Sequence, residues 1–424
     1  MAKPKEPTKF DPTVGSTVDV GVDDAQVADA THYMKEVTCV AVMTPQGDPN
    51  NPSCVWGTPV VYWGLSSTAK TGQIEDAGLE LALQVETIYP GQHGPEDFSG
   101  VLVPNSLTGV SIECSLDAVR RLNAIGRGII FLDELSNATR ATEGAMLGFV
   151  HKRRAGNLPI APRVRILGAA NPPKWSTNGY QMTGPTANRY CHFQVKCPPH
   201  RKWIQRMISG PPQNVQDPTV TEELVRARWR EEYGHALALT TGYIEHQPMS
   251  LHHEPPPESP QSGYGWSSPK TWEQAARMYA TAKILGYPQA VIELCLEGCL
   301  GPAMAFEFMS YVRNSDLPSP EHVLRKGWEP DVTRLDIAFA VLANATQYVL
   351  NTDDRQEAEE LAVGLWNLFG KFVAQGLGDM IITSAKKLTD KNLSRKAGGE
   401  VQTAADPLIR WMVDNGIMRY AQEA

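Results

Sequence analysis

The sequence lacks the features that mark a membrane, secreted or nucleic-acid-binding protein. No apolar run approaches the roughly 20 residues that a membrane-spanning helix needs, and the first residues, MAKPKEPTKFDP, have no apolar core of a signal peptide. The 39 Lys and Arg residues are outnumbered by 47 Asp and Glu residues, whereas a broad nucleic-acid-binding surface needs clustered basic side chains. We therefore expect a cytoplasmic protein with neither a membrane nor a nucleic acid as its partner.

Cysteine is scarce and odd in number, with 7 residues in a chain of 424. Together with the missing export signal, this indicates reduced thiols rather than disulfides. Two sets of side chains could bind a metal, namely Cys295 with Cys299, and Cys191 with His192 and Cys197. Neither set has paired C-x-x-C ligands and both lie in apolar stretches, so burial is the favoured interpretation.

A glycine is missing from a stretch that otherwise looks like a phosphate-binding loop. The sequence GLSSTAKT, Gly64 to Thr71, follows an apolar run and ends in Lys-Thr. Such loops read G-x-x-x-x-G-K-[ST], because glycine lets successive backbone N–H groups curl around phosphate oxygens. Here Ala69 stands in place of the second glycine. Taken alone, the loop could be a working nucleotide site, a decayed one or a chance match.

Short apolar runs alternate with helix-like segments between about residues 50 and 200. The runs are 60–63, 128–132 and 164–170, and the helix-like segments are 71–85, 115–125 and 141–153. This alternation predicts an α/β fold whose parallel sheet is covered by helices on both faces. Upstream we expect a short helix at 23–34 and a strand at 37–43. After residue 267, apolar residues at three- and four-residue spacing predict helices almost to the end.

The domain organisation that we expect follows these changes of pattern. It comprises an N-terminal segment (1–50), an α/β nucleotide-binding core (51–200), a helical and Pro-rich linker (201–266), a helical lid (267–328) and a helical C-terminal extension (329–424).

Two acids, Asp133 and Glu134, directly follow the apolar run 129–132. Ligands of open α/β sheets bind at the carboxyl ends of the strands, which is where these carboxylates are expected. In a nucleotide hydrolase the first acid holds magnesium and the second accepts a proton from the attacking water. An isolated Asp-Glu pair is more often a solvated turn, but here a Lys-Thr loop precedes it at the right distance.

Two further polar residues lie at the ends of predicted strands. Asn171 follows the run 164–170, where its amide could orient the attacking water or contact the terminal phosphate, although Asn-Pro alone is only a turn signal. Arg189 precedes the run 190–193, and its planar guanidinium could reach the phosphates of a neighbouring subunit. Alone, Arg189 could equally be an ordinary surface or salt-bridged arginine.

The order of these elements resembles that of the AAA+ ATPases and, within them, the MoxR family. Three other stretches carry the resemblance, namely PEDFSG at 95–100, AMLGFVHKRR at 145–154 and SPKTW at 268–272. It covers roughly residues 56–313. The resemblance implies an AAA+ P-loop NTPase core, with a parallel sheet and flanking helices, followed by an all-helical lid. The helical C-terminal extension lies beyond it.

The resemblance also implies ATP and Mg²⁺ as ligands and gives each candidate residue a role. The phosphate loop would comprise Gly64, Ser67, Thr68, Ala69 and Lys70, with Lys70 on the β- and γ-phosphates. Magnesium would bind Thr71 and Asp133. Catalysis would depend on Glu134 as the residue that activates water, Asn171 as sensor 1 and Arg189 as the finger that acts on a neighbouring subunit.

Three positions depart from the family pattern. Ser67 and Ala69 occupy positions where family members usually have glycine, and a positive φ at Ala69 would cost about 1–2 kcal/mol, or about tenfold in affinity. Lys270 stands at the position of the sensor 2 arginine, which contacts the nucleotide. Lysine keeps the charge but lacks the bidentate fork.

The leading hypothesis is an ATP-hydrolysing chaperone or remodelling motor that forms a homo-oligomeric ring, most often a hexamer. Its partner would be a protein client, with a von Willebrand factor A domain protein as the candidate that the resemblance implies. Two loops, 101–112 and 154–163, could grip this client. The alternative is a nucleotide-stabilised scaffold protein with weak or no turnover. A nucleic-acid motor is a third hypothesis, supported by Lys152–Arg154, Arg163 and Arg165 but disfavoured by the net charge.

Overall fold

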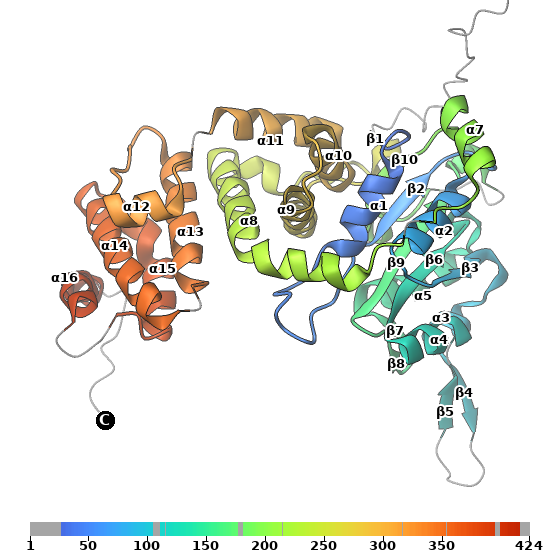
Figure 1. Ribbon diagram of the computed structural model, residues 1–424, viewed down its shortest axis with the longest axis horizontal. Coiled ribbons are helices and arrows are strands. Elements are labelled where there is room, and N and C mark those ends of the chain that lie inside the picture. Colours follow the sequence, from blue (N-terminus) through green and yellow to red (C-terminus); the bar gives the residue numbers. More distant parts are fainter. Residues whose placement is uncertain are drawn as a thin grey trace, which may run out of the picture.

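The chain forms an α/β core, a central group of helices and a C-terminal helical bundle, which follow one another along the longest axis of the molecule (Figure 1). The computed structural model describes residues 27–104, 111–114, 116–176, 181–213, 215–315, 317–352, 354–394 and 399–415. No helix among these residues is long and apolar enough to cross a membrane.

The core is built on a six-stranded sheet in which every pairing is parallel. The strand order is β1 (Ala28–Asp29), β10 (Cys191–Gln194), β2 (Val60–Trp63), β9 (Arg163–Ala170), β6 (Arg127–Leu132) and β3 (Val85–Ile88). Trp63 lies opposite both Ala170 and Gln194, so the carboxyl ends of the three adjacent strands β10, β2 and β9 meet at one edge. The expected α/β core with a parallel sheet is confirmed.

Helices cover both faces of the sheet, because successive side chains of a buried strand point to opposite sides. In β2, Val60 and Tyr62 belong to one hydrophobic cluster, whereas Val61 and Trp63 belong to another. The first cluster also contains residues of α1 (Met34–Met43), α2 (Lys70–Glu80), α8 (Pro218–His246), α9 (Pro269–Ile284) and α10 (Gln289–Leu300). The second contains residues of α3 (Pro95–Ser99), α4 (Asp117–Ile125) and α5 (Arg140–Lys152).

The N-terminal expectations were wrong in two places. Residues 37–43, expected as a strand, lie in helix α1, in which Val37, Val40 and Ala41 are fully buried. A short apolar run cannot distinguish a buried strand from a buried helix, and packing between the sheet and the lid helices decided it. Within 23–34, expected as a helix, Ala28–Asp29 forms strand β1, and 23–26 lie outside the described residues.

A long helix follows the core. The core ends with α6 (Gly184–Ala187) and α7 (His200–Ser209), and helix α8 (Pro218–His246) follows. Asp217 caps the N-terminus of α8, because its side chain accepts a hydrogen bond from Thr219 N. This helix of 29 residues spans much of segment 201–266. Its Val225 and Trp229 are buried in the same hydrophobic cluster as the sheet, so α8 is an integral part of the packed structure.

The remaining helices form the lid and the C-terminal bundle. The lid comprises α9 (Pro269–Ile284), α10 (Gln289–Leu300) and α11 (Pro302–Asn314). The bundle comprises α12 (Pro320–Lys326), α13 (Leu335–Leu350), α14 (Arg355–Ala374), α15 (Gly378–Asp390) and α16 (Glu400–Asp414), and has a hydrophobic cluster of its own. The predicted all-helical character of both parts is confirmed, and α13 joins the bundle to α8 by direct packing.

Two hairpins lie toward the same end of the core (Figure 1). One is formed by β4 (Val101–Pro104) and β5 (Ser111–Cys114), and the other by β7 (Arg154–Ala155) and β8 (Leu158–Pro159). Gly156 N, in the turn of the second hairpin, donates to Phe98 O of α3, the helix that leads into β4. The expected loop 101–112 thus has paired strands at its ends, and its residues 105–110 lie outside the described residues.

Candidate functional site

The predicted phosphate loop connects the carboxyl end of β2 to helix α2. Gly64 N donates to Ala170 O at 3.1 Å, which holds the loop against the end of β9. A Cβ atom at Gly64 would lie 2.3 Å from Val195 O, so this position accepts only glycine. The loop leads into the N-terminus of α2, where backbone N–H groups favour an anion.

Two other loop residues have the backbone conformation that glycine favours. Ser67 has φ 64° and Ala69 has φ 63° with ψ 23°, both in the left-handed region. For residues with a Cβ this conformation costs about 1–2 kcal/mol each. The loop therefore keeps the backbone conformation of a glycine-containing loop at an energetic cost that the surrounding contacts must offset. One such contact comes from Thr68, which is buried between Ser67 and Ala69 and donates from Oγ1 to Leu65 O at 2.9 Å.

Lys70 lies inside the loop. Its Nζ donates to Gly64 O and Leu65 O, both at 2.8 Å, and to Asn171 Oδ1 at 3.3 Å. Burial lowers the pKa of Lys70 to about 8, against the opposing influence of the Asp133 and Glu134 carboxylates. These contacts hold a cation inside the loop, next to the N-terminus of α2.

Thr71 and Asp133 are brought into direct contact. Thr71 Oγ1 donates to Asp133 Oδ2 at 2.7 Å, and Asp133 Oδ1 accepts from Glu134 N at 2.9 Å. A hydroxyl and a carboxylate are the oxygen donors that Mg²⁺ prefers. No group of three or more His, Cys, Asp and Glu side chains in the described part of the chain could hold a metal. The hydroxyl of Thr71 and the carboxylate of Asp133 fit a magnesium ion that would take its other ligands from phosphates and water.

Glu134 and Asn171 flank this pair. Glu134 is exposed, with φ 55°, and its Oε2 accepts from Asn137 Nδ2 at 2.9 Å. Asn171 is buried, and its Nδ2 contacts Ser66 Oγ at 3.3 Å while its backbone N donates to Ser136 Oγ at 3.1 Å. The supporting residues Ser66, Ser136 and Asn137 were not predicted, because single polar residues in loops give no pattern.

Arg189 and Lys270 lie close to each other, away from the phosphate loop. Arg189 precedes the first residue of β10, whereas the phosphate loop follows the last residue of the parallel neighbour β2, so the two are at opposite edges of the sheet. Lys270, in the first turn of α9, lowers the pKa of His151 together with Arg189, after the larger effect of burial. The structure thus does not bring these two predicted site residues to the loop of their own chain.

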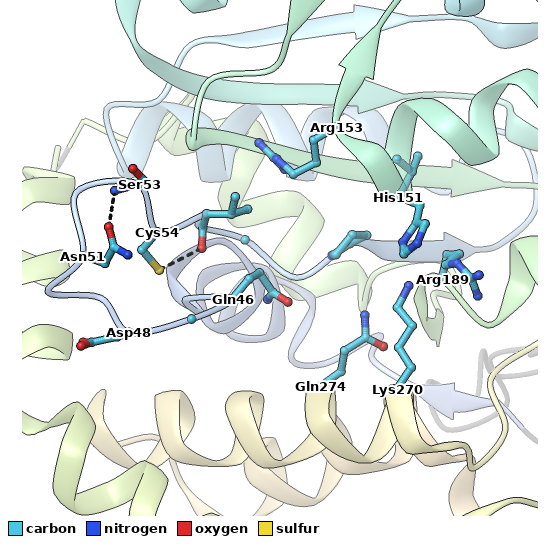
Figure 2. Close-up of a pocket in the computed structure, with 15 residues that line it drawn as sticks. Gln46, Asp48, Asn51, Ser53, Cys54, His151, Arg153, Arg189, Lys270 and Gln274 are labelled. Carbon is cyan, nitrogen blue, oxygen red and sulfur yellow. Dashed lines mark hydrogen bonds between the residues drawn. The ribbon is translucent and has the colours of Figure 1, made fainter. Parts of the chain in front are cut away.

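A cavity of about 390 Å³ contains this second group of cations. Figure 2 shows the Lys270 side chain pointing toward Arg189 and His151, with Gln274 beside it. The lining residues include Gly57 and Pro59, which precede β2, and none from 64–71. Burial, together with the smaller effect of the Arg189 charge, lowers the pKa of Lys270 to about 8.

The Arg189 segment is held to the start of α9 by a polar contact. Ser268 Oγ, in the N-cap of α9, donates to Asn188 Oδ1 at 2.9 Å. Arg189 Nε is buried and has no hydrogen-bond partner among the described residues. Arg189 as a whole is partly exposed and lines the cavity, where its positive charge favours an anion.

Neither candidate cysteine set is arranged as a metal site. Cys191 Sγ and Cys299 Sγ lie 2.9 Å apart, and both residues are fully buried between β10 and α10. His192 Nδ1 accepts from Trp63 Nε1 at 2.9 Å, and burial lowers its pKa to about 4. Cys197 is exposed. The favoured interpretation as buried residues agrees with the positions of Cys191, Cys295 and Cys299 but not with that of Cys197.

One residue proposed for nucleic-acid contact is inaccessible. Arg165 is fully buried, and its Nη2 donates to Glu222 Oε1 at 2.6 Å, joining β9 to α8. Arg163 and Arg226 contact the same carboxylate group at 3.5 Å. Arg165 therefore has a structural role and cannot belong to the basic surface that the hypothesis of a nucleic-acid motor requires.

Comparisons with known proteins leave the family undecided. No protein-family model and no curated protein matches the chain. Among solved structures, the chain is similar to a putative ATPase from Cytophaga hutchinsonii, at 13% sequence identity and a TM-score of 0.41. The match covers 69% of this chain and 91% of the other. A likeness this distant carries no argument about activity, which must be argued from the site itself.

Proposed function

We propose that the chain binds ATP with Mg²⁺ at the loop 64–71 and hydrolyses the terminal phosphate. The observation that carries this proposal is the 2.7 Å contact between Thr71 Oγ1 and Asp133 Oδ2, beside the buried cation of Lys70. It brings together a hydroxyl, a carboxylate and an ammonium group from separate elements. These are the groups that a magnesium-bound polyphosphate requires.

Each residue of the site has a distinct task in this proposal. Lys70 and the N–H groups at the start of α2 hold the phosphates, and Thr71 with Asp133 holds magnesium, which when bound neutralises charge that develops on the phosphate oxygens. Glu134 accepts a proton from the attacking water. Asn171, which contacts both Lys70 and Ser66, positions the water or the terminal phosphate.

The proposal requires a second copy of the chain at each site. Arg189 and Lys270 lie at the opposite sheet edge from the loop, so they contact the nucleotide of a neighbouring copy rather than their own. The position of Arg189 and Lys270 in the lining of a cavity that contains no residue of the loop 64–71 supports this assignment. Repetition of one such contact closes a ring, for which we take the hexamer that the AAA+ resemblance implies.

We propose that ATP hydrolysis drives mechanical work on a protein client, as in the MoxR family that the sequence resembles. The hairpins β4–β5 and β7–β8 support a client surface, because they lie toward one end of the core and are linked through Gly156 N and Phe98 O. A von Willebrand factor A domain protein is the candidate client. Co-sedimentation of such a domain with the full chain, with and without ATP, tests this part.

Nucleotide binding and turnover are tested together. Equilibrium dialysis with ATP and Mg²⁺ should show binding by the wild type and by Glu134→Gln, and loss of binding in Lys70→Ala. Lys326→Ala, which changes an exposed lysine on α12, is the control. Phosphate release should occur in the wild type and fall by at least two orders of magnitude in Glu134→Gln, as expected for loss of a general base (~10²–10⁴-fold). No nucleotide binding by the wild type would overturn the proposal.

The second candidate function is a nucleotide-stabilised scaffold with weak or no turnover. The positive φ angles of Ser67 and Ala69 favour it, because a strained loop binds phosphate less well than its glycine counterpart. Equal phosphate release near zero in the wild type and Glu134→Gln, with ATP still bound to both, would select the scaffold over the motor.

A further inference from the structure

Helix α7 presents its apolar side chains to solvent, while two of its basic side chains, Lys202 and Arg206, contact the rest of the molecule. No residue of α7 is buried, and its large apolar residues are all exposed, namely Trp203, Ile204, Met207 and Ile208. Their spacing places them on one face of the helix. On the other face, Lys202 Nζ donates to His32 O at 2.9 Å, and Arg206 binds both carboxylate oxygens of Asp76 at 2.6 and 2.8 Å.

This arrangement is the reverse of an ordinary surface helix, which buries its apolar stripe against the core. The ion pair and the hydrogen bond fix α7 so that the apolar face points outward. Ile208 is 81% exposed and Met207 65% exposed, although both are large apolar side chains. A contiguous exposed apolar face of this kind marks a surface that another molecule covers.

The position of α7 relates this surface to the nucleotide loop. Strand β10 leads into α7, and Val195 O, just after β10, packs directly against Gly64. Asp76, the partner of Arg206, belongs to α2, whose first turn contains Lys70 and Thr71. In Figure 1, α7 stands beside α2 at the outer surface of the core.

A second exposed apolar patch lies near Lys270, which the proposed function assigns to the nucleotide site of a neighbouring copy. It consists of Met249, which is 86% exposed, and Leu251, both in the 3-10 helix η4 (Pro248–Leu251). This helix is fixed to the start of α9, because Trp272 Nε1 donates to Ser250 O at 2.9 Å and His253 N donates to Ser267 O at 3.0 Å. Met249 and Leu251 therefore lie close to the turn that contains Lys270.

We propose that the apolar face of α7 docks against the Met249–Leu251 patch of a second copy of this chain. The proposal rests on the proposed function, in which Arg189 and Lys270 of one copy complete the nucleotide site of another. Each patch accompanies one half of that divided site, so a single docking contact both covers the apolar side chains and joins the two halves. Because the two surfaces differ, the contact is head-to-tail and can propagate around a ring.

The test measures particle mass by sedimentation velocity in the presence of ATP and Mg²⁺. The wild type should form particles of several times the chain mass of 46.6 kDa. Ile208→Asp and Met249→Asp should each sediment as single chains, because each lacks one of the two surfaces. An equimolar mixture of the two variants should form dimers, since one intact α7 face then meets one intact Met249 patch. Phe306→Asp, which changes an exposed side chain on α11, is the control and should assemble like the wild type.

Several results would overturn the proposal. These are a wild type that remains a single chain, a variant of either patch with wild-type mass, a mixture without dimers, or equal dissociation of Phe306→Asp. Circular dichroism and thermal melting confirm that the variants are folded, which the exposure of the substituted side chains leads us to expect. Binding of ATP to the single-chain variants, measured by equilibrium dialysis, separates the two proposals. A lack of ATP binding by all of these proteins would refute the nucleotide site, whereas the sedimentation result would still decide the docking proposal.

Discussion

Thr71 Oγ1 donates a hydrogen bond of 2.7 Å to Asp133 Oδ2 and so joins the first turn of α2 to the end of β6. The two residues are far apart in the sequence, and parallel strand pairing through β9 places them at one edge of the sheet. The pair is the centre of the proposed magnesium site, and it gives the first prediction.

Asp133→Ala should remove the effect of magnesium on ATP binding. Without its carboxylate the site loses one charged ligand, worth about 1.5–3 kcal/mol, so affinity in the presence of Mg²⁺ should fall about 10- to 100-fold. Affinity in EDTA should stay close to that of the wild type. Titration calorimetry with and without Mg²⁺ measures this difference. Asp117→Ala, on the exposed side of α4, should change neither value, and an equal loss with and without metal would contradict the assignment.

Ala69→Gly should stabilise the protein. Ala69 has φ 63°, a conformation that costs about 1–2 kcal/mol for a residue with a Cβ and little for glycine. The greater freedom of glycine in the unfolded chain offsets about 0.5–1 kcal/mol of this gain, which leaves an increase of about 1 kcal/mol. Urea unfolding measures it.

Ala77→Gly in the interior of α2 is the matched control for that change. The same substitution in regular helical conformation should destabilise the protein by about 1 kcal/mol. Shifts of the same sign at both positions would show that the strain at Ala69 is not the cause.

ATP affinity should fall as the pH rises above about 8. The pKa of Lys70 without nucleotide is lowered to about 8 by burial, and bound phosphate favours the charged form. Above pH 8 the free protein has lost the proton that the complex keeps, so binding takes up a proton and affinity drops by up to about tenfold per pH unit. Below pH 8 this dependence disappears. Lys70→Arg, which stays charged, should bind ATP without this slope, and a wild-type profile that is flat to pH 9.5 would contradict the prediction.

Arg165→Met should strongly destabilise the protein. The change leaves the Glu222 carboxylate buried without its closest partner, and breaking a buried pair in this way costs about 3–5 kcal/mol. Arg325→Met breaks the exposed pair with Glu321 and should cost less than about 1 kcal/mol. Urea unfolding of both variants gives the comparison. A loss in Arg165→Met no larger than in Arg325→Met would mean that the buried pair contributes little.

The α/β core was predictable because its signals are local and repeated. Three apolar runs, followed by the loop that ends in Lys-Thr, by Asp-Glu and by Asn, predicted three central strands and the polar side chains beyond their carboxyl ends. Strand β3 was not predicted, since Val85 to Thr87 are only partly buried and include polar residues that hide the strand pattern. Helix α1 was predicted as a strand, because its β-branched residues are typical of strands and its burial on several sides removes the helical periodicity.

The candidate site was predictable residue by residue but not in its arrangement. The sequence supplied Lys70, Thr71, Asp133, Glu134 and Asn171, and the structure groups them. It also supplied Arg189 and Lys270, but gave no sign that these two lie together in a separate cavity. Their distance from the loop depends on how lid helix α9 packs on the core, and contacts between elements distant in sequence leave no local pattern.

The sequence by itself determined the chemical groups of the site and the class of fold, because strand and helix periodicity and the order of polar residues are properties of short segments. Only the tertiary structure decided that Ser67 and Ala69 take a glycine-type conformation, that Arg165 is a buried structural cation, and that the apolar face of α7 points to solvent. The last two outcomes depend on Glu222 and Asp76 respectively, and both partners come from another part of the chain. Side-chain packing across the fold, rather than local preference, fixed them.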